Sequence, residues 1–410
     1  MNLIIVNVDS IRLGRPLPFA LRDATGVLLA PKGFVVEKRA DLDLIIAQRG
    51  RVFIDATESD GHHRAYVETL HTLVRQDQSL GVIAETGIAS SSLSSLKSNA
   101  EPGEPDWVFL QAQTAGMLRD SDPASFSTRL DKLHTLLGWH LRTNPDGVLF
   151  ALIHLSASEV QQYSATHAML VSVMCTLAAR EVLKWSPEAE VSLGKAALTM
   201  NLGMTELQDR LARQKEAPSP QQRKEINAHA ERSVDMLKAL GVTDPDWLEA
   251  VADHHTKVPG PLAARTPGQR LARLIQRADM FAACLAPRLT RAAVAPAVAM
   301  KASYFDENKQ IDEAGAALIK VVGIYSPGSY VRLATHEIAV VIQRGANTTT
   351  PRVAVLVSRS GLPTAEHMVR DTSQSEFKIT ASVPYREVKV KINLPKMLTM
   401  TKPMASNRAR

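Results

Sequence analysis

The chain has 410 residues, of which 45% are hydrophobic and 22% charged, and its formal net charge is +6. This length predicts two or three domains, and the apolar content is enough for packed cores. The basic excess would help attract a polyanion, but charges of both signs at this density are ordinary. Nucleic-acid binding is therefore not predicted, and a small phosphate-containing ligand fits the charge equally well.

The cysteines and the apolar runs bear on the cellular compartment. Cys175 and Cys284 each lie inside a helical pattern, which indicates neither a disulfide framework nor a structural zinc site. The apolar run at residues 3–8 is too short for an export signal and follows no basic segment, and no later run approaches a membrane-spanning length. We therefore expect a cytoplasmic protein with no transmembrane segment.

Residues 1–60 are predicted to form a small β-rich domain, because short apolar runs such as 3–8 and 52–54 are separated by Gly, Asp and Pro. Residues 61–105 contain a helical pattern from 64 to 86 and then a linker rich in Ser, Gly and Pro. No catalytic constellation occurs in this part of the chain. Sensing, docking of a protein partner or homodimerisation are the roles that remain open for the first domain.

Residues 106–325 are predicted to be helical, since apolar positions recur every three or four residues. Ser219-Pro220-Gln221-Gln222 and Thr266-Pro267-Gly268-Gln269 both have the pattern of an N-cap with a reciprocal glutamine, and Asp244-Pro245 opens a third helix. These signals place three helix starts. The expected fold is mainly α, with an all-helical domain between two β-rich parts.

Residues 326–410 are predicted to form a β-rich C-terminal appendage that ends in a basic tail. The hydrophobic period becomes alternating at 338–343 and 352–357, and a further alternating stretch covers 378–392. From residue 396 to the end there are four basic residues and no acidic ones, so we expect a solvated end.

Five residues of ligand type fall on or beside apolar helix faces of the helical domain. They are His167, His229, His254, His255 and Asp279. An inward-pointing carboxylate is costly unless a metal, another cation or hydrogen bonds compensate it. Four imidazoles and one carboxylate are sufficient ligands for iron, manganese or zinc. A purely structural interpretation stays open, in which the paired histidines complement a helix dipole and Asp279 caps a helix or pairs with an arginine.

The stretch from Tyr163 to Leu333 resembles the HD-GYP family, the bacterial all-helical phosphohydrolases that open cyclic di-GMP. Several family motifs occur in the family's order. They are Tyr163 with His167, then His229, His254-His255, Ala278-Asp279-Met280-Phe281-Ala282, Arg288-Leu289-Thr290-Arg291, and the closing Tyr-x-Pro-Gly-Ser-x-Val-x-Leu signature from Tyr325 to Leu333. The resemblance implies an HD-type helical fold and assigns the four histidines and Asp279 to the family's metal-ligand set.

The departures from the family pattern fall on its chemistry. The His-Asp-Ile-Gly-Lys motif reads Met200-Asn201-Leu202-Gly203-Met204 here, so both ligands of the doublet and the lysine are replaced. The doublet carboxylate bridges two ions roughly 3.5 to 4 Å apart in a two-metal site. The loop after His255, Thr256 to Ala264, keeps only Gly260 of the family's Gly-Tyr-Pro loop. No catalytic residue is therefore assigned.

Three functions are compatible with the family motifs that are present and those that are replaced. The first is a degenerate, non-catalytic signalling module that binds a cyclic dinucleotide or docks a protein, with Arg288, Arg291 and Lys257 holding phosphates. The second is an active phosphodiesterase with a reduced site that holds one divalent ion. The third is a scaffold without a nucleotide ligand, similar to the related HDOD family, in which no metal is bound and core hydrogen bonds satisfy the histidines.

Overall fold

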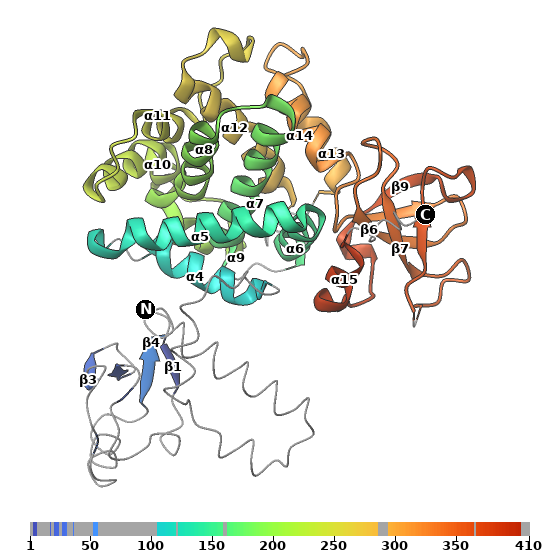
Figure 1. Cartoon of the computed structure of the whole chain (residues 1–410), viewed down its shortest axis with the longest axis horizontal. Helices are drawn as coiled ribbons and strands as arrows, with labels where there is room; N and C mark the ends of the chain where they lie inside the picture. The colour runs from blue at the N-terminus through green and yellow to red at the C-terminus, as the bar shows by residue number, and fades with distance from the viewer. Residues whose placement is uncertain are drawn as a thin grey trace, which may run out of the picture. The chain divides into compact units, whose positions relative to one another are not determined.

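The structure is a computed structural model of the chain that describes residues 3–5, 17, 20–23, 27–30, 36, 52–55, 105–119, 122–158, 162–285, 294–364 and 366–402. It divides into two compact units, Met1–Glu104 and Pro105–Arg410, each with its own internal contacts (Figure 1).

The first unit contains a four-stranded antiparallel sheet. Its strands are β1 (Leu3–Ile5), β2 (Leu21–Arg22), β3 (Leu28–Ala30) and β4 (Phe53–Asp55), in the order β1-β4-β2-β3. Apolar side chains such as those of Leu21 and Val52 are buried. The prediction of a small β-rich N-terminal part is confirmed. The predicted helix at 64–86 and the Ser-rich stretch that follows it lie outside the described residues.

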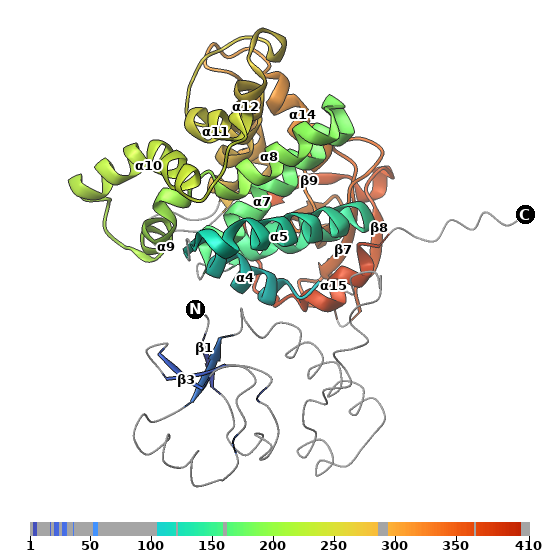
Figure 2. The same cartoon turned by 60° about the vertical axis from the view of Figure 1, so that its left-hand side comes forward.

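Helices make up most of the second unit (Figures 1 and 2). They are α4 (Trp107–Arg119), α5 (Pro123–Thr143), α6 (Pro145–Ser158), α7 (Tyr163–Leu177), the π-helical η4 (Ala178–Leu183), α8 (Pro187–Thr199), the short η5 (Leu202–Met204), α9 (Thr205–Arg213), α10 (Pro220–Ala239), α11 (Pro245–Asp253), the short η6 (Leu262–Ala264), α12 (Pro267–Leu285), α13 (Pro296–Tyr304) and α14 (Glu313–Val322). The predicted mainly helical fold is confirmed.

The helix starts follow the capping signals of the sequence. The Ser219 hydroxyl accepts a hydrogen bond from Gln222 N while the Gln222 side chain accepts one from Ser219 N, which is the reciprocal box predicted there. Thr266 and Gln269 repeat the pair, and Asp244 accepts from two backbone N–H groups of α11. These local signals fix where α10, α11 and α12 begin.

Helix α7 is the centre of the helical unit. All of its side chains are buried, and it packs against α6, α8 and α12. Together with η4 it forms one continuous segment, Tyr163–Leu183, that is long and apolar enough to cross a membrane, but 78% of the apolar window is buried inside the protein. That burial is typical of a core helix, and α7 therefore serves as the platform on which the neighbouring helices are placed.

A five-stranded antiparallel sheet follows the helices. Its strands are β5 (Tyr330–Leu333), β6 (Ile338–Gln343), β7 (Arg352–Val357), β8 (Val369–Asp371) and β9 (Ile379–Val383), in the order β8-β7-β6-β5-β9. The alternating segments predicted at 338–343 and 352–357 coincide with β6 and β7. The predicted stretch at 378–392 is a strand only as far as Val383. The predicted β-rich C-terminal appendage is thus confirmed.

The chain after the sheet corrects the prediction of a solvated end. A further helix, α15 (Leu394–Met400), follows the sheet and buries the side chain of Met397 completely. Thr401 is also buried, and its carbonyl accepts a hydrogen bond from the Gln343 side chain. The first residues of the predicted tail are therefore packed against the protein, because apolar Met397 lies on the inner face of a helix. Residues 403–410 lie outside the described residues.

The signature from Tyr325 to Leu333 brings the start of the sheet into contact with helix α6. Gly328 has φ +86°, and a Cβ atom at this position would lie 2.9 Å from the Phe150 carbonyl oxygen. Tyr385 donates its hydroxyl hydrogen bond to the Gly328 carbonyl. Glycine is required here by both the left-handed backbone and the close approach of α6.

Candidate metal centre

Helix α10 supplies the first histidine of the site. His229 is buried in the middle of this helix, and its Nδ1 donates a hydrogen bond to the carbonyl oxygen of Ile226. A carbonyl can only accept, so this contact assigns the proton to Nδ1 and leaves the lone pair on Nε2.

The end of α11 supplies the other two histidines. His254 follows the last residue of α11 and is completely buried, whereas His255 is exposed. His254 Nδ1 donates to the Val251 carbonyl oxygen at 2.7 Å, so its Nε2 also carries a lone pair. Two of the histidines therefore have the same tautomer, and in each case a backbone carbonyl fixes it. A backbone partner on the second ring nitrogen is the usual support of a histidine that binds metal.

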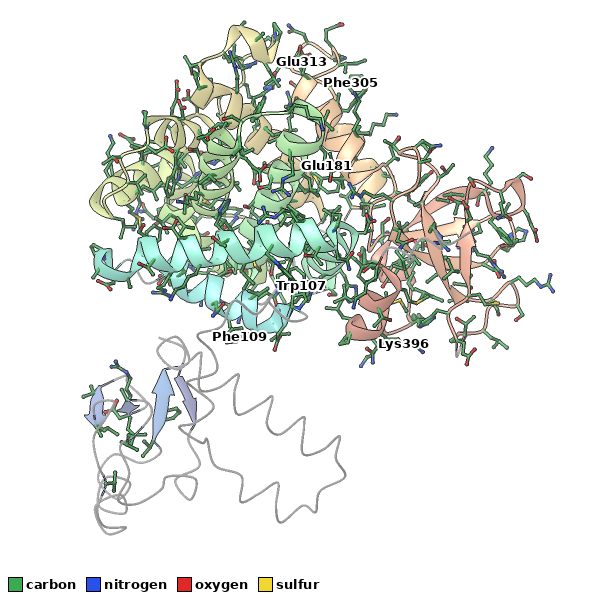
Figure 3. All side chains as sticks on the ribbon, viewed as in Figure 1. Trp107, Phe109, Glu181, Phe305, Glu313 and Lys396 are labelled. Carbon is green, nitrogen blue, oxygen red and sulfur yellow. The ribbon has the colours of Figure 1, made fainter. Side chains whose placement is uncertain are left out.

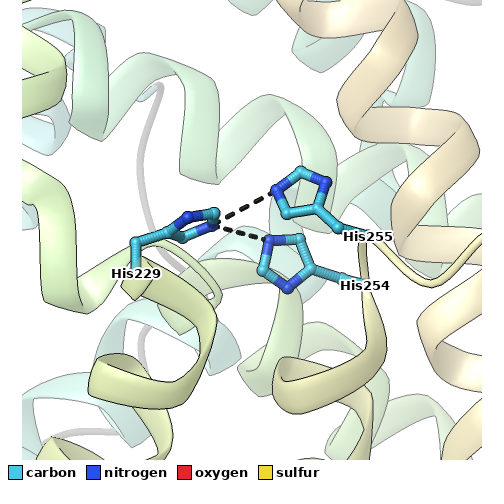
Figure 4. A group of neighbouring side chains, drawn as sticks. All are labelled: His229, His254 and His255. Atoms are coloured by element: carbon cyan, nitrogen blue, oxygen red, sulfur yellow. Dashed lines mark hydrogen bonds between the residues drawn. The ribbon is translucent and has the colours of Figure 1, made fainter. Parts of the chain in front are cut away.

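The Nε2 atoms of the three histidines converge on one point (Figure 4). His229 Nε2 lies 3.1 Å from His254 Nε2 and 3.2 Å from His255 Nε2. One ligand atom from each of the three residues lies within 4.8 Å of the others. Their positions come from two helix segments far apart in the sequence, so the arrangement is a product of tertiary packing. We call these three residues the histidine triad.

Burial favours the neutral forms of His254 and His229. It lowers the pKa of His254 from 6.5 to about 3, with a smaller electrostatic contribution from nearby His255, and it also lowers the pKa of His229. Two lone pairs, on His229 and His254, thus face each other at hydrogen-bond distance, and His255 can donate at most one N–H between them. Such a set of acceptors gains stability from a cation at its centre. Three neutral imidazole nitrogens suit a transition-metal ion such as Zn²⁺ or Fe²⁺.

His167 and Asp279 form a second group beside the histidine triad. His167 Nε2 donates to Asp279 Oδ1 at 2.7 Å, and Tyr163 stacks on the His167 ring with 5.5 Å between centroids. Burial alone would raise the pKa of Asp279, but the His167 hydrogen bond and the electrostatic contributions of the nearby histidines lower it to about 2. Asp279 is therefore an ionised carboxylate close enough to the triad to interact with it electrostatically.

The five predicted ligands thus lie together, in two groups. Among the described residues, the hydrogen-bonded partner of Asp279 is His167 and not an arginine. The four histidines and Asp279 stay a prediction as metal ligands, and the histidine triad is the part whose ligand atoms already converge on one point.

The segment that stands where the resembled family has its His-Asp doublet lies against α10, the helix that carries His229. Met200 ends α8 with its side chain 1% exposed, and the chain then turns through Asn201 into η5. Gly203 approaches α10 so closely that a Cβ atom would lie 2.9 Å from the carbonyl oxygen of His229. A thioether and a neutral amide therefore occupy the two doublet positions, and neither offsets the charge of a hard cation.

The predicted phosphate-binding residues are distributed differently. Lys257 is exposed in the loop that follows the histidine triad. Backbone groups of this loop are held by side chains, because Gln276 donates to the Thr256 carbonyl at 2.9 Å and Glu313 accepts from Leu262 N at 2.9 Å. Arg288 and Arg291 lie outside the described residues. The three cations stay predicted as phosphate ligands.

A second buried polar cluster lies on the same helix, α12. Arg273 and Arg277 have side chains only 2% exposed, and both form ion pairs with Glu307 and Asp312. The labels Phe305 and Glu313 in Figure 3 mark the loop and helix end that carry these acids. Hydrogen bonding by Arg273 lowers the pKa of Glu307 to about 2. We call these four residues the arginine cluster.

Two residues near the site were not singled out by sequence reasoning as functional. Ser233 lies one turn after His229, and Asp209 lies on α9 with its carboxylate bound to Ser164 at the start of α7. Ser233 was visible in the sequence on the same helix as His229. Nothing in the local pattern marks Asp209, since it caps a helix other than its own.

Comparisons with known proteins add one similar structure. No family model matches the chain, and no curated protein matches it. A solved structure described as an HDG"Y"P protein from Bdellovibrio bacteriovorus is similar to it, with 14% sequence identity and a TM-score of 0.42. The alignment covers 77% of this chain and 98% of that one.

Proposed function

We propose that the helical unit is a degenerate HD-GYP-like signalling module that holds one divalent transition-metal ion and binds a cyclic dinucleotide without hydrolysing it. The observation that carries the proposal is the convergence of three Nε2 atoms, two of which have lone pairs fixed by backbone carbonyls. The order of motifs from Tyr163 to Leu333 supports the family assignment.

The residues present fit a single ion. His229, His254 and His255 would hold it, and the ionised Asp279 would balance its charge. When bound, an ion of this class offers a positive centre to a phosphate oxygen. Around it, Lys257, Arg288 and Arg291 would contribute cations for the remaining phosphate charge, since these contacts do not depend on the metal.

The absence of turnover follows from the residues beside the histidine triad. Hydrolysis of a phosphodiester by this fold needs a bridging carboxylate to hold a second ion, and Met200 and Asn201 supply no negative charge there. The loop from Thr256 to Ala264 also lacks the family's Gly-Tyr-Pro residues. Ligand binding survives these losses, whereas stabilisation of the charge on a phosphoryl transition state does not.

One observation favours the second function, an active phosphodiesterase with a reduced site. Three histidine ligands are the number that catalytic zinc sites supply from the protein, with the fourth position left to water or substrate.

The proposed role as a non-catalytic signalling module implies a cytoplasmic location. Both thiols, Cys175 and Cys284, are free, which supports that location.

A pair of binding and cleavage assays separates the candidates. Protein purified without a chelator is mixed with cyclic di-GMP in the presence of Mn²⁺ or Fe²⁺, and binding is followed by calorimetry while the products are separated by chromatography. Binding without a linear product supports the proposal. Metal-dependent release of linear product identifies the reduced phosphodiesterase, and the absence of binding leaves the scaffold. His229→Ala should abolish the metal dependence, and His367→Ala, in the C-terminal part, serves as its control.

Restoring the doublet tests the alignment of the motif. The double variant Met200→His with Asn201→Asp restores an imidazole and a carboxylate at the doublet positions, and if these face the metal, metal occupancy should rise above that of the wild type. Elemental analysis of the purified protein measures the change. A flat occupancy would mean that these two positions do not face the metal.

A further inference from the structure

One short segment of the chain touches both groups of the candidate metal centre. It runs from Gly203 in η5 to Asp209 in α9 and is helical over nearly its whole length. One end lies against α10, which carries His229, and the other end contacts α7, which carries His167. The same segment begins two residues after Asn201.

At the first end, the Ser233 hydroxyl joins the segment to the backbone of His229. Ser233 is completely buried, its Oγ donates to the His229 carbonyl at 2.7 Å, and the same Oγ accepts from Gly203 N at 2.9 Å. Gly203 leaves no space for a side chain, because a Cβ atom would lie 2.9 Å from both the His229 carbonyl oxygen and Ser233 N. The backbone that carries His229 is therefore held at van der Waals contact with the segment.

At the second end, Asp209 supplies the N-terminal cap that α7 lacks. The residue at the N-cap position, Gln162, makes no side-chain cap hydrogen bond. Asp209 instead accepts from Ser164 N at 2.8 Å and from Ser164 Oγ at 3.0 Å, and Arg119 donates to it at 2.6 Å. A carboxylate at a helix N-terminus satisfies a free N–H group and complements the helix dipole. Helix α7 is thus anchored three residues before His167.

We propose that Gly203–Asp209 is a positioning strut, which sets the separation between the histidine triad and the His167–Asp279 pair through its two anchors, Ser233 and Asp209. The inference rests on the proposed metal site. Neither anchor touches the ligand atoms, so both are positioning residues. A metal site needs its ligands held to within about 0.5 Å, and outer contacts of this kind typically contribute 10- to 100-fold in metal affinity.

The test uses Co²⁺ as the probe, because its absorption bands report coordination geometry as well as occupancy. The full-length variants are Ser233→Ala and Asp209→Asn, each titrated with Co²⁺ under the conditions used for the wild type. Each should weaken binding by about 10-fold and shift the absorption bands. If both anchors hold one strut, loss of either anchor already removes its effect on the ligands. The double variant should then lose much less Co²⁺ affinity than the roughly 100-fold product of the two single losses.

Ser172→Ala is the matched control. Ser172 is likewise a buried serine, and its hydroxyl joins α7 to α8 by donating to the Gly194 carbonyl at 2.9 Å, a contact that involves no residue of the histidine triad. It should lower the thermal unfolding midpoint about as much as Ser233→Ala while leaving the Co²⁺ affinity and bands unchanged. If an anchor variant fails to fold, Arg119→Ala weakens the hold on Asp209 from a half-exposed position, and it should give a smaller loss of affinity in the same direction.

The inference and the proposed function fail in different ways. A wild-type protein that binds no Co²⁺ overturns the metal site, and the strut with it. A wild-type protein that binds Co²⁺ while the anchor variants bind equally tightly, or while the double variant shows the full product of the two losses, overturns the strut alone.

Discussion

The arginine cluster and the histidine triad are two buried polar groups in one helical unit, and they differ in how their charges and lone pairs are satisfied. Arg273 and Arg277 lie among two carboxylates, Glu307 and Asp312, so two positive charges meet two negative ones. In the histidine triad, His229 and His254 already use their N–H donors on backbone carbonyls, so their Nε2 atoms are acceptors. The charges of the first group are balanced within it, whereas the proposed metal ion would complete the second.

From this contrast we expect a structural role for the arginine cluster and metal binding by the histidine triad. A buried ion network costs desolvation of its charges and is retained when it is fully paired. Facing lone pairs on His229 and His254 repel each other, and the proposed ion would make the arrangement favourable. We therefore expect stability to depend mainly on the arginine cluster and metal affinity on the triad.

Breaking the arginine cluster should have the largest effect on folding. Asp312→Ala removes a buried carboxylate that pairs with both arginines and also caps α14 through Gly315 N. Loss of one partner from a buried ion pair typically costs about 3–5 kcal/mol, measured here as the free energy of unfolding in urea. Asp306→Ala, in the same loop, is the control and should cost about 1 kcal/mol, since it removes only turn hydrogen bonds. Equal effects of the two variants would contradict the comparison.

Removing one histidine of the triad should change metal binding far more than folding. His255 is exposed, so His255→Ala leaves no cavity and should change the stability of the metal-free protein by less than about 0.5 kcal/mol. The same variant should weaken Zn²⁺ binding on the order of 100-fold, which corresponds to about 2.7 kcal/mol of lost stabilisation by metal. Zinc titrations and thermal melts with and without chelator measure both quantities. A large stability loss without metal would make His255 a structural residue.

The two clusters should also respond to pH in different windows. The pKa of His254 is about 3 in the folded protein and 6.5 when unperturbed, so the unfolded chain binds the proton first and stability falls as pH drops from 6.5 toward 3. Glu307 has a folded pKa of about 2 against 4.5, so its contribution is lost only as pH falls from 4.5 toward 2.

The free energy of unfolding of chelator-treated protein should therefore fall by about 2 kcal/mol between pH 6.5 and 5. Glu307 does not contribute to this decrease. Urea unfolding at a series of pH values measures the loss. His254→Asn should flatten this window, and Glu307→Gln should leave it unchanged while flattening the lower one. A wild-type profile that is level down to pH 5 would contradict the burial of a neutral His254.

The parts of the fold that local chemistry determines could be predicted from the sequence. The capping pairs at Ser219 and Thr266 place helix starts because a side chain bonds to backbone three residues away. The apolar, β-branched runs at 338–343 and 352–357 place two strands correctly, but the predicted alternation is wrong, because β6 and β7 are buried on both faces. The end of the chain was misjudged, since Met397 becomes buried only when α15 packs against α6 and β6.

The candidate site could be predicted as a set of residues but not as an arrangement. Motif order identified the four histidines and Asp279, whereas their division into a triad and a pair depends on the distances between α7, α10, α11 and α12. The tautomers of His229 and His254 depend on backbone carbonyls, which every residue has and no side-chain pattern marks. Asp209 was also not identified, because it caps another helix at Ser164, which lies 45 residues before it in the sequence.

The most direct test of the account is the metal content of the full chain purified without chelator, measured by elemental analysis beside His229→Ala prepared in parallel. The account predicts about one transition-metal ion per chain in the wild type and a large loss in the variant. A wild-type protein with no more metal than His229→Ala, and none after incubation with Zn²⁺ or Fe²⁺, would contradict it.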